Sequence, residues 1–511
     1  MFLTETDIIN MQVTAGAGKN TSNIIKELID GDLSSVQKKR MAEGKRYYLG
    51  EHDILNKDFR KSYITSTDGG YDGEETEKTE LFVNPNRSNE RIANQFHRIL
   101  IDQKAAYIAG REPTVSVKGA EKDGSAKAYE TALTDFADEK FNDVILSAVK
   151  GAGNKGFETI HVYYGADGNL NYCIVPAEEV IPIYDTEYQE ELKELIRYYS
   201  ITVLKDGRQC LRKRVEWWTK EDVTYYEETE ENIYIRDISR SINPSPHFWQ
   251  VTSLNGLEQR RTPHSWGRVP FIILKNNDEM TTDLQKVKGL IDAYDLISSQ
   301  GTNDLLDLVA LYWVIQGYGG ETANSIARKL QLNRAVNVIG SDGGKISAEQ
   351  VDIPVTGRLE WLKMLRRDIF NFGMGIDVDS DRFGNAPSGV SLKFQYTLLD
   401  LKANAVAAKL KRAVKELLWY VTEDINRKNG TSYDSGLIEV GLNKTMITND
   451  METVQILTQS KGLISDKTII ARHPFVDDVN EELKELEAQE KKEQEKWEEN
   501  MTARGGEAVE R

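Results

Sequence analysis

The residues best suited to metal chemistry are three carboxylates that alternate along the chain. Asp377, Asp379 and Asp381 have the spacing with which a calcium-binding loop begins. Arg382 replaces the Gly that such a loop needs for its turn, and Ser388 stands where its bidentate Glu belongs. The run therefore favours an exposed acidic loop over a dedicated metal site. A metal-dependent phosphohydrolase or nuclease that uses these three carboxylates is kept as an alternative.

Other patterns associated with nucleotide binding or catalysis are incomplete. Gly16, Gly18 and Lys19 are similar to part of a phosphate-binding loop, but Asn20 occupies the Ser or Thr position and no apolar strand precedes it. A flexible leader over residues 1–19 explains the segment better. The six histidines show no pair at metal-ligand spacing: His52, His97, His161, His247, His264 and His473. We predict no catalytic residue, no metal and no cofactor, and therefore a protein that is not an enzyme.

Four aspartates recur at multiples of three residues in a helical segment: Asp292, Asp295, Asp304 and Asp307. Most such stripes form a solvated helix face. Because another side of the same helix is apolar, the stripe also fits the lining of an aqueous passage formed by several copies. A later segment has the opposite charge bias, and its basic residues either pair with these carboxylates between neighbours or decorate the surface: Lys393, Lys402, Lys409, Lys411, Arg412 and Lys415.

Composition limits the class of protein that carries these residues. The chain has 511 residues, enough for about three to five compact units. It has 65 Lys and Arg against 82 Asp and Glu, a formal charge of −17, so any contact with DNA must be local. Only Cys173 and Cys210 occur, which fits a reducing, cytosolic setting. No signal peptide or apolar window long enough to span a membrane is visible, so neither export nor insertion is expected.

The first half of the chain predicts helices followed by a sheet. We expect a helix over 20–50, an exposed loop from Ser62 to Leu81 because of its glycines and polar residues, and helices over Asn89–Ala109 and about 124–150. Residues 157–275 are rich in Thr, Val, Ile, Tyr and Trp. Two Asp-Gly turns, Asp167-Gly168 and Asp206-Gly207, indicate hairpins of an antiparallel sheet. The predicted fold class is α+β.

Long helices dominate the second half. Apolar spacing predicts one helix from Asp283 to Tyr312 and another from Thr356 to about Gly375, flanking a small α/β insert with a strand at 335–339. After a polar loop, 376–389, the segment Val390–Asn429 contains neither Gly nor Pro and predicts about 40 helical residues. A short strand near 437–442 and further helices follow, and residues 477–499 carry 11 acidic and 4 basic residues.

Several short motifs, taken in order, resemble the portal proteins of tailed bacteriophages, in particular the group found in long-tailed phages of Gram-positive bacteria. None is specific alone, but their order and spacing cover most of the chain. They are Tyr47-Tyr48-x-Gly50-x-His52-x-Ile54; Asp102-Gln103-Lys104 with Tyr107, Gly110 and Pro113; Gly267-x-x-Pro270-Phe271; Asn276-Asn277; Asp283-Leu284; Leu290-Ile291-Asp292-x-Tyr294-Asp295; Ile353-Pro354; Ser388-Gly389; Leu399-Asp400-Leu401-Lys402-Ala403; and Asn449-Asp450.

This resemblance implies a mainly helical portal fold with a β-rich wing, a two-helix stem, a small α/β clip, a long kinked helix and a helical crown. The expected segments follow in chain order: leader 1–19, wing 20–282 with strands returning at 437–447, stem helix 283–318, clip 319–354, stem helix 355–377, tunnel loop 378–389, long kinked helix 390–430, crown 449–490 and charged tail 491–511.

The resemblance also implies a function. Such proteins form a ring, with twelve subunits in the particle, at one capsid vertex, and double-stranded DNA passes through it during packaging and ejection. The expected partners are the major capsid and scaffolding proteins, with the terminase motor and the head-tail adaptor at the clip. The expected location is the virion, after assembly in the host cytoplasm. Arg382, Phe383 and Asn385 of the tunnel loop are the expected DNA contacts. A helical scaffold or tail protein without a channel is a second alternative.

Overall fold

The protein combines helices and strands in two compact units, which confirms the α+β class. The computed structural model describes residues 3–14, 21–69, 75–85, 87–205, 208–254, 258–307, 311–316, 335–338, 345–350, 355–377, 389–444, 450–471 and single residues or pairs of residues between 473 and 492. One unit comprises Met1–Asp377 and Leu398–Thr445, and the other comprises Val378–Thr397 and Met446–Arg511. Among the described residues, no helix has the length and apolar character that crossing a membrane requires.

The N-terminal segment is more ordered than its sequence predicts. Helix α1 spans Glu5–Thr14, Thr4 forms a bridge with Tyr184, and Ile8 is buried in the core, so the predicted flexible leader is wrong for this part. Residues 15–20 lie outside the described part. The predicted helix 20–50 is two helices, α2 (Thr21–Ser34) and α3 (Val36–Tyr48). They separate at Ser35, whose hydroxyl accepts a hydrogen bond from Lys38 N and thereby caps α3.

The loop predicted for Ser62–Leu81 is wrong, because its two halves form an antiparallel hairpin. Strand β1 (Lys61–Gly69) pairs with β2 (Glu75–Val83), with Lys61 opposite Val83. The run Tyr63-Ile64-Thr65 contains aromatic and β-branched residues that favour strands. Of the glycines that suggested a loop, Gly69 ends β1, and Gly70 and Gly73 lie outside the described residues.

The helices after this hairpin begin at other residues than predicted. Helix α4 spans Phe96–Ala109, and residues 89–95 before it have no regular secondary structure. The helix expected over 124–150 is two helices, α5 (Gly124–Phe136) and α6 (Glu139–Lys155). Asp138 separates them because its carboxylate accepts a hydrogen bond from Phe141 N at the start of α6.

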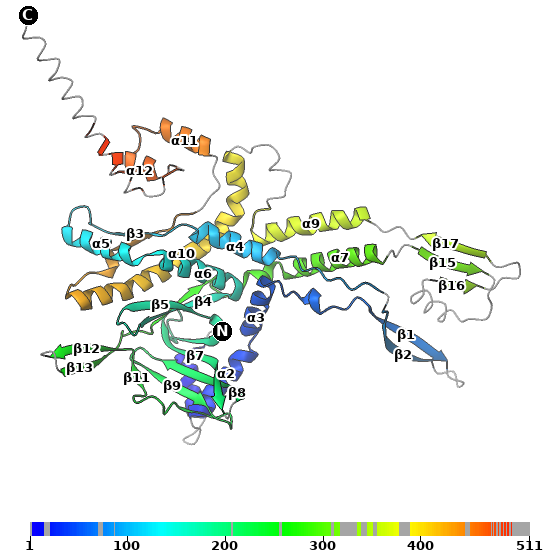
Figure 1. Cartoon of the computed structure of the whole chain (residues 1–511), viewed down its shortest axis with the longest axis horizontal. Coiled ribbons are helices and arrows are strands. Elements are labelled where there is room, and N and C mark those ends of the chain that lie inside the picture. Colours follow the sequence, from blue (N-terminus) through cyan, green and yellow to red (C-terminus); the bar gives the residue numbers. More distant parts are fainter. Residues whose placement is uncertain are drawn as a thin grey trace, which may run out of the picture. The chain divides into compact units, whose positions relative to one another are not determined.

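The predicted antiparallel sheet is confirmed as three groups of strands (Figure 1). Gly168 has a φ of +77° in the first Asp-Gly turn, between β4 and β5. Strands β7 and β8 pair on either side of Asp206-Gly207, which lie outside the described residues. A three-stranded sheet has the order β14-β4-β5, a larger sheet the order β10-β9-β8-β7-β6 with β11 beside β9, and β12 pairs with β13. The strands are β4 (Phe157–Tyr164), β5 (Leu170–Val175), β6 (Val180–Tyr184), β7 (Leu192–Lys205), β8 (Arg208–Trp218), β9 (Asp222–Glu228), β10 (Tyr234–Arg236), β11 (Ser245–Pro246), β12 (Phe248–Leu254), β13 (Glu258–His264) and β14 (Phe271–Lys275).

The helix predicted for Asp283–Tyr312, and with it the stem helix 283–318, is wrong at both ends. A 3₁₀ turn, η4 (Asp283–Lys286), precedes α7 (Lys288–Leu306), and Leu311–Gln316 form strand β15. The run Leu311-Tyr312-Trp313-Val314-Ile315 consists of residues that strongly favour strands. This preference outweighs the helical spacing of apolar residues on which the prediction rested. Strand β15 lies between β16 (Ala335–Val338) and β17 (Lys345–Gln350), which confirms the strand expected at 335–339.

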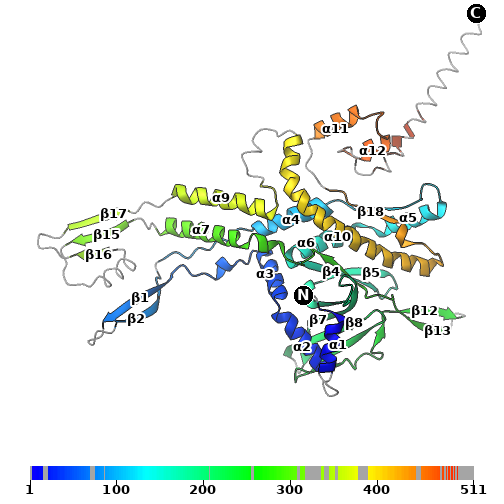
Figure 2. The ribbon, with the colours of Figure 1, turned by 180° about the vertical axis from the view of Figure 1, so that it is seen from behind.

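The remaining helical predictions are confirmed. Helix α9 spans Val355–Gly373 and α10 spans Gly389–Asn429. Figures 1 and 2 show α7 and α9 side by side, with the sheet of β15, β16 and β17 at their far ends. Strand β18 (Ile438–Gly441) returns to pair with β3 (Thr114–Val117), and the second unit contains α11 (Asp450–Gln459) and α12 (Asp466–Ala471).

An apolar core joins α3, α4, α7 and α9. Its buried members are Tyr47, Phe96, Leu100, Leu284, Val287, Ile291, Ile369 and Phe370. The packing is tight where α9 ends, because a Cβ added to Gly373 would lie 2.5 Å from Leu100 Cδ1. This core fixes α7 and α9 to the helices that precede them in the sequence.

Candidate functional site

An extended segment, residues 88–94, lies along α7 and is bonded to it at regular intervals. We call this segment the strap. Its backbone N–H groups of Ser88, Glu90, Ile92 and Asn94 donate to side-chain oxygens of Asp307 (2.7 Å), Asn303 (2.7 Å), Ser299 (2.9 Å) and Asp295 (2.8 Å), respectively. Two extended residues advance about 6.6 Å, and four helical residues about 6.0 Å. Because these distances nearly match, every second strap amide meets every fourth residue of α7.

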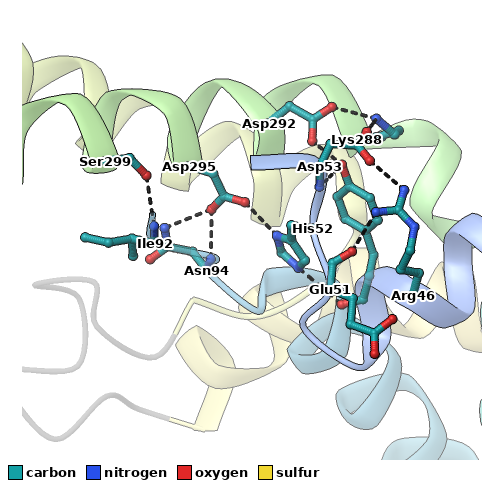
Figure 3. Close-up of polar contacts among 11 residues, drawn as sticks. Arg46, Glu51, His52, Asp53, Ile92, Asn94, Lys288, Asp292, Asp295 and Ser299 are labelled. Carbon is teal, nitrogen blue, oxygen red and sulfur yellow. Dashed lines mark hydrogen bonds and ion pairs between the residues drawn. The ribbon is translucent and has the colours of Figure 1, made fainter. Parts of the chain in front are cut away.

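Asp295 is the most enclosed residue of this ladder. Its carboxylate lies 2.6 Å from His52 Nδ1 and accepts hydrogen bonds from the backbone and side-chain nitrogens of Asn94, as Figure 3 shows. The side chains of His52 and Asp295 are both 0% exposed. A buried carboxylate is tolerated only when donors surround it, and these three contacts meet that need. The predicted channel lining is therefore wrong for Asp295, because its carboxylate does not reach solvent.

A more exposed network lies one turn before Asp295 on α7. Asp292 accepts hydrogen bonds from Tyr47 Oη and Lys288 Nζ, and Lys288 also pairs with Asp53 (Figure 3). Asp53 in turn pairs with Arg46. Although partial burial acts the other way, hydrogen bonds from Lys288 and Arg46 lower the pKa of Asp53 to about 2. The network fastens the start of α7 to the end of α3.

The other two predicted lining residues also have partners within the chain. Asp304 forms an ion pair with Arg358, which joins α7 to α9, and Asp307 accepts the amide of Ser88. A lining role for Asp292, Asp304 and Asp307 stays a prediction, but each carboxylate already stabilises the subunit itself.

The carboxylate of Asp283, in the turn η4 that precedes α7, binds two buried lysines. Asp283 Oδ2 lies 2.6 Å from Lys104 Nζ on α4 and 3.0 Å from Lys402 Nζ on α10, while Asn276 donates to its other oxygen. Lys402 also donates to the carbonyl of Gly373 at the end of α9. Burial lowers the pKa of Lys104 to about 8, even though Asp283 favours its charged form. Together, these contacts join α4, η4, α9 and α10.

The run that suggested a metal loop is only partly described. Asp377 receives hydrogen bonds from both Nε and Nη2 of Arg366, the geometry of a strong bidentate ion pair. Asp379 and Asp381 lie outside the described residues, as do the predicted DNA contacts Arg382, Phe383 and Asn385. Among the described residues, no three His, Cys, Asp or Glu side chains are grouped so that they could hold a metal ion.

Sequence reasoning identified the aspartates of α7 but not their main partner. Polar residues with a side-chain oxygen recur at intervals of four: Asp295, Ser299, Asn303 and Asp307. This pattern is missed when only the aspartates are considered. The strap, however, carries no sign of its role, because its backbone amides make the contacts. The sequence also did not indicate His52 as the partner of Asp295, because the two residues are 243 positions apart.

Comparisons with known proteins agree over nearly the whole chain. Residues 30–496 match the family model described as phage portal protein, SPP1 Gp6-like. The chain is 30% identical over 473 residues to the portal protein of Bacillus phage SPP1, an alignment that covers 90% of this chain and 87% of that protein. It is 27% identical over 489 residues to the portal protein of Clostridium phage phiCD119, covering 92% and 96%, respectively.

Proposed function

Since the chain belongs to the SPP1 Gp6-like family of phage portal proteins, with a role at the capsid portal in DNA packaging, we propose that twelve copies form a ring at one capsid vertex. The family match over residues 30–496 carries this proposal. In the ring, double-stranded DNA passes through the central channel during packaging and later ejection. The protein is then a component of the virion, assembled in the host cytoplasm.

Apolar side chains exposed on the paired helices support assembly. On α7, Leu305 is 65% exposed, and on α9 Trp361 and Phe372 are 57% and 61% exposed. Side chains of this size on adjacent helices favour burial against another subunit. We assign α7 and α9 to the stem, with their faces against the stems of neighbouring copies.

The sheet of β15, β16 and β17 is the proposed clip, at which the terminase motor and the head-tail adaptor dock. The wing and crown are the proposed contacts with the major capsid and scaffolding proteins. Members of this family are structural proteins, and we assign ATP hydrolysis to the separate motor rather than to this chain. In this proposal β15 (Leu311–Gln316) belongs to the clip, which the sequence pattern placed at 319–354.

The tunnel loop, 378–389, is the proposed DNA contact inside the channel. Its charged, aromatic and amide side chains Arg382, Phe383 and Asn385 suit contact with the duplex backbone without base reading. We expect Arg382→Ala to alter the length or retention of the packaged genome while rings still enter procapsids. Normal packaging by this variant would show that the loop does not contact DNA in the channel.

Negative-stain imaging and analytical ultracentrifugation of the purified chain test the ring directly. We expect rings with a central channel, and fewer of them in a Leu305→Glu, Trp361→Glu variant than in Lys122→Gln, Lys127→Gln, which changes charge elsewhere. A monomer at high protein concentration would contradict the proposal, and rods or solid rings would favour the scaffold alternative. Nuclease activity that depends on a divalent metal and is lost in Asp379→Asn would favour the enzyme alternative. Asp377 is poorly placed as a metal ligand in that alternative, because its carboxylate is already paired with Arg366.

A further inference from the structure

A hollow of about 680 Å³ lies between α10 and the two-stranded sheet of β3 and β18, away from the stem. Three cationic residues of α10 form one wall: Lys411, Arg412 and Lys415. Thr114 and Ser116, which share one side of β3 because side chains alternate along a strand, line the opposite wall together with Glu439. The polar groups that line the hollow are thus two ammonium groups, one guanidinium, two hydroxyls and the carboxylate of Glu439.

Some charged side chains of the hollow have ion-pair partners and others do not. Arg412 pairs with Glu190, and Glu439 lies 3.5 Å from Lys118. Lys411 and Lys415 are exposed and have no ion-pair partner among the residues that the structure describes. They lie one helical turn apart, so both ammonium groups can approach the same anionic ligand. In a chain of net charge −17, these two lysines give the hollow a local excess of positive charge beside the hydroxyl groups of Thr114 and Ser116.

We propose that this hollow binds backbone phosphates of double-stranded DNA outside the channel. Lysine and Ser or Thr side chains are typical donors to DNA phosphates, and such contacts carry no sequence information. A duplex presents adjacent phosphates along one strand, which suits two ammonium groups on neighbouring turns. The inference rests on the proposed portal function, because a ring in a capsid is exposed to packaged DNA as well as to the DNA in its channel.

Covalently closed circular DNA provides the test, since it has no end that can enter a ring. Binding of the full-length protein to a closed circular plasmid is measured over a range of salt concentrations, for the parent, Lys411→Gln, Lys415→Gln and the control Lys122→Gln, Lys127→Gln. The control lysines are exposed, and the change in charge is the same. We expect the first double variant to bind the plasmid more weakly. The slope of log K against log salt should fall by about 1.8 for each engaged subunit, at roughly 0.9 per phosphate contact.

Three outcomes would overturn the inference. Equal binding by both double variants would show that the hollow does not contact DNA. If instead the hollow variant kept plasmid binding but lost binding to a poly-glutamate peptide, the site would be a dock for acidic peptides. Imaging the same samples separates this test from that of the portal function. Loss of rings only in Lys411→Gln, Lys415→Gln would identify the hollow as a subunit contact and overturn the DNA assignment. Absence of rings in the parent protein would instead contradict the portal proposal itself.

Discussion

His52 Nδ1 lies 2.6 Å from Asp295 Oδ2, and neither side chain is accessible to solvent. The two residues are 243 positions apart in the sequence, so the contact ties α7 to the segment that follows α3. The same carboxylate also receives two hydrogen bonds from Asn94 at the end of the strap. Asp295 is therefore the point at which three separate segments meet.

Removal of the Asp295 carboxylate should strongly destabilise the protein. Asp295→Ala leaves His52 and the strap amide of Asn94 buried without their acceptor, and we expect a loss of about 3–5 kcal/mol in the free energy of unfolding. Urea denaturation of the full-length protein measures the change. Asp292→Ala is the matched control on the same helix, and because its side chain is 35% exposed it should cost about 1 kcal/mol or less. Similar losses in both variants would show that burial of Asp295 does not dominate.

The strap should detach locally when its acceptors on α7 are removed. Ser299→Ala and Asn303→Ala delete the side-chain oxygens that accept from the amides of Ile92 and Glu90. Each unsatisfied amide costs about 1–3 kcal/mol. Hydrogen exchange of residues 88–94 should therefore become faster in each variant.

Thr302→Ala is the control for the strap experiment, since the Thr302 hydroxyl donates to Ser298 O within α7 and not to the strap. Exchange of the strap amides should be unchanged in this variant. Unchanged exchange in Ser299→Ala as well would mean that packing, rather than the ladder of hydrogen bonds, holds the strap.

Stability should decrease as the pH falls from 6.5 towards 4. Burial lowers the pKa of His97 from 6.5 to about 4, although nearby Asp283 acts in the opposite direction. The unfolded chain therefore takes up a proton in this range while folded His97 stays neutral, so the contribution of His97 is complete above pH 6.5 and is lost below it. The maximum loss is about 3 kcal/mol.

Urea midpoints measured at several pH values between 7 and 4.5 test this dependence. His97→Gln should show a smaller decrease than the parent protein, whereas the partly exposed His264→Gln should follow the parent. His161, whose pKa burial also lowers to about 4, contributes in the same direction and accounts for part of the remaining decrease. Identical pH profiles of the parent and His97→Gln would contradict the assignment.

Substitution of Asp283 should destabilise the protein more than substitution of Lys402, one of the two lysines that share its carboxylate. Asp283→Asn leaves Lys104 and Lys402 buried without a counter-charge and should cost about 3–5 kcal/mol. In Lys402→Met, Asp283 keeps Lys104 as its partner, so the loss should be about 1–3 kcal/mol and arise mainly at the Gly373 carbonyl. Denaturation of both variants measures the order, and a larger loss in Lys402→Met would show that α10 depends on Lys402 for more than this ion pair.

Several elements follow from the sequence alone, because short-range signals determine them. The absence of Gly and Pro from Val390 to Asn429 predicts α10, and Asp-Gly turns between β-branched segments predict the hairpins β4-β5 and β7-β8. Each of these elements depends on residues close together in the chain. The family resemblance is also available at this level, since ordered motifs need no knowledge of contacts.

Tertiary structure alone decided the role of the acidic residues. Whether an aspartate on α7 faces water or is buried depends on which segment packs against it, and the strap is about 200 residues earlier in the sequence. The strap contributes backbone amides, which every residue except proline possesses, so its side chains carry no sign of the ladder. Asp295 and Asp292 belong to the same acidic stripe in the sequence, yet only Asp295 is fully buried, because the partner segments cover one side of the helix and not the other.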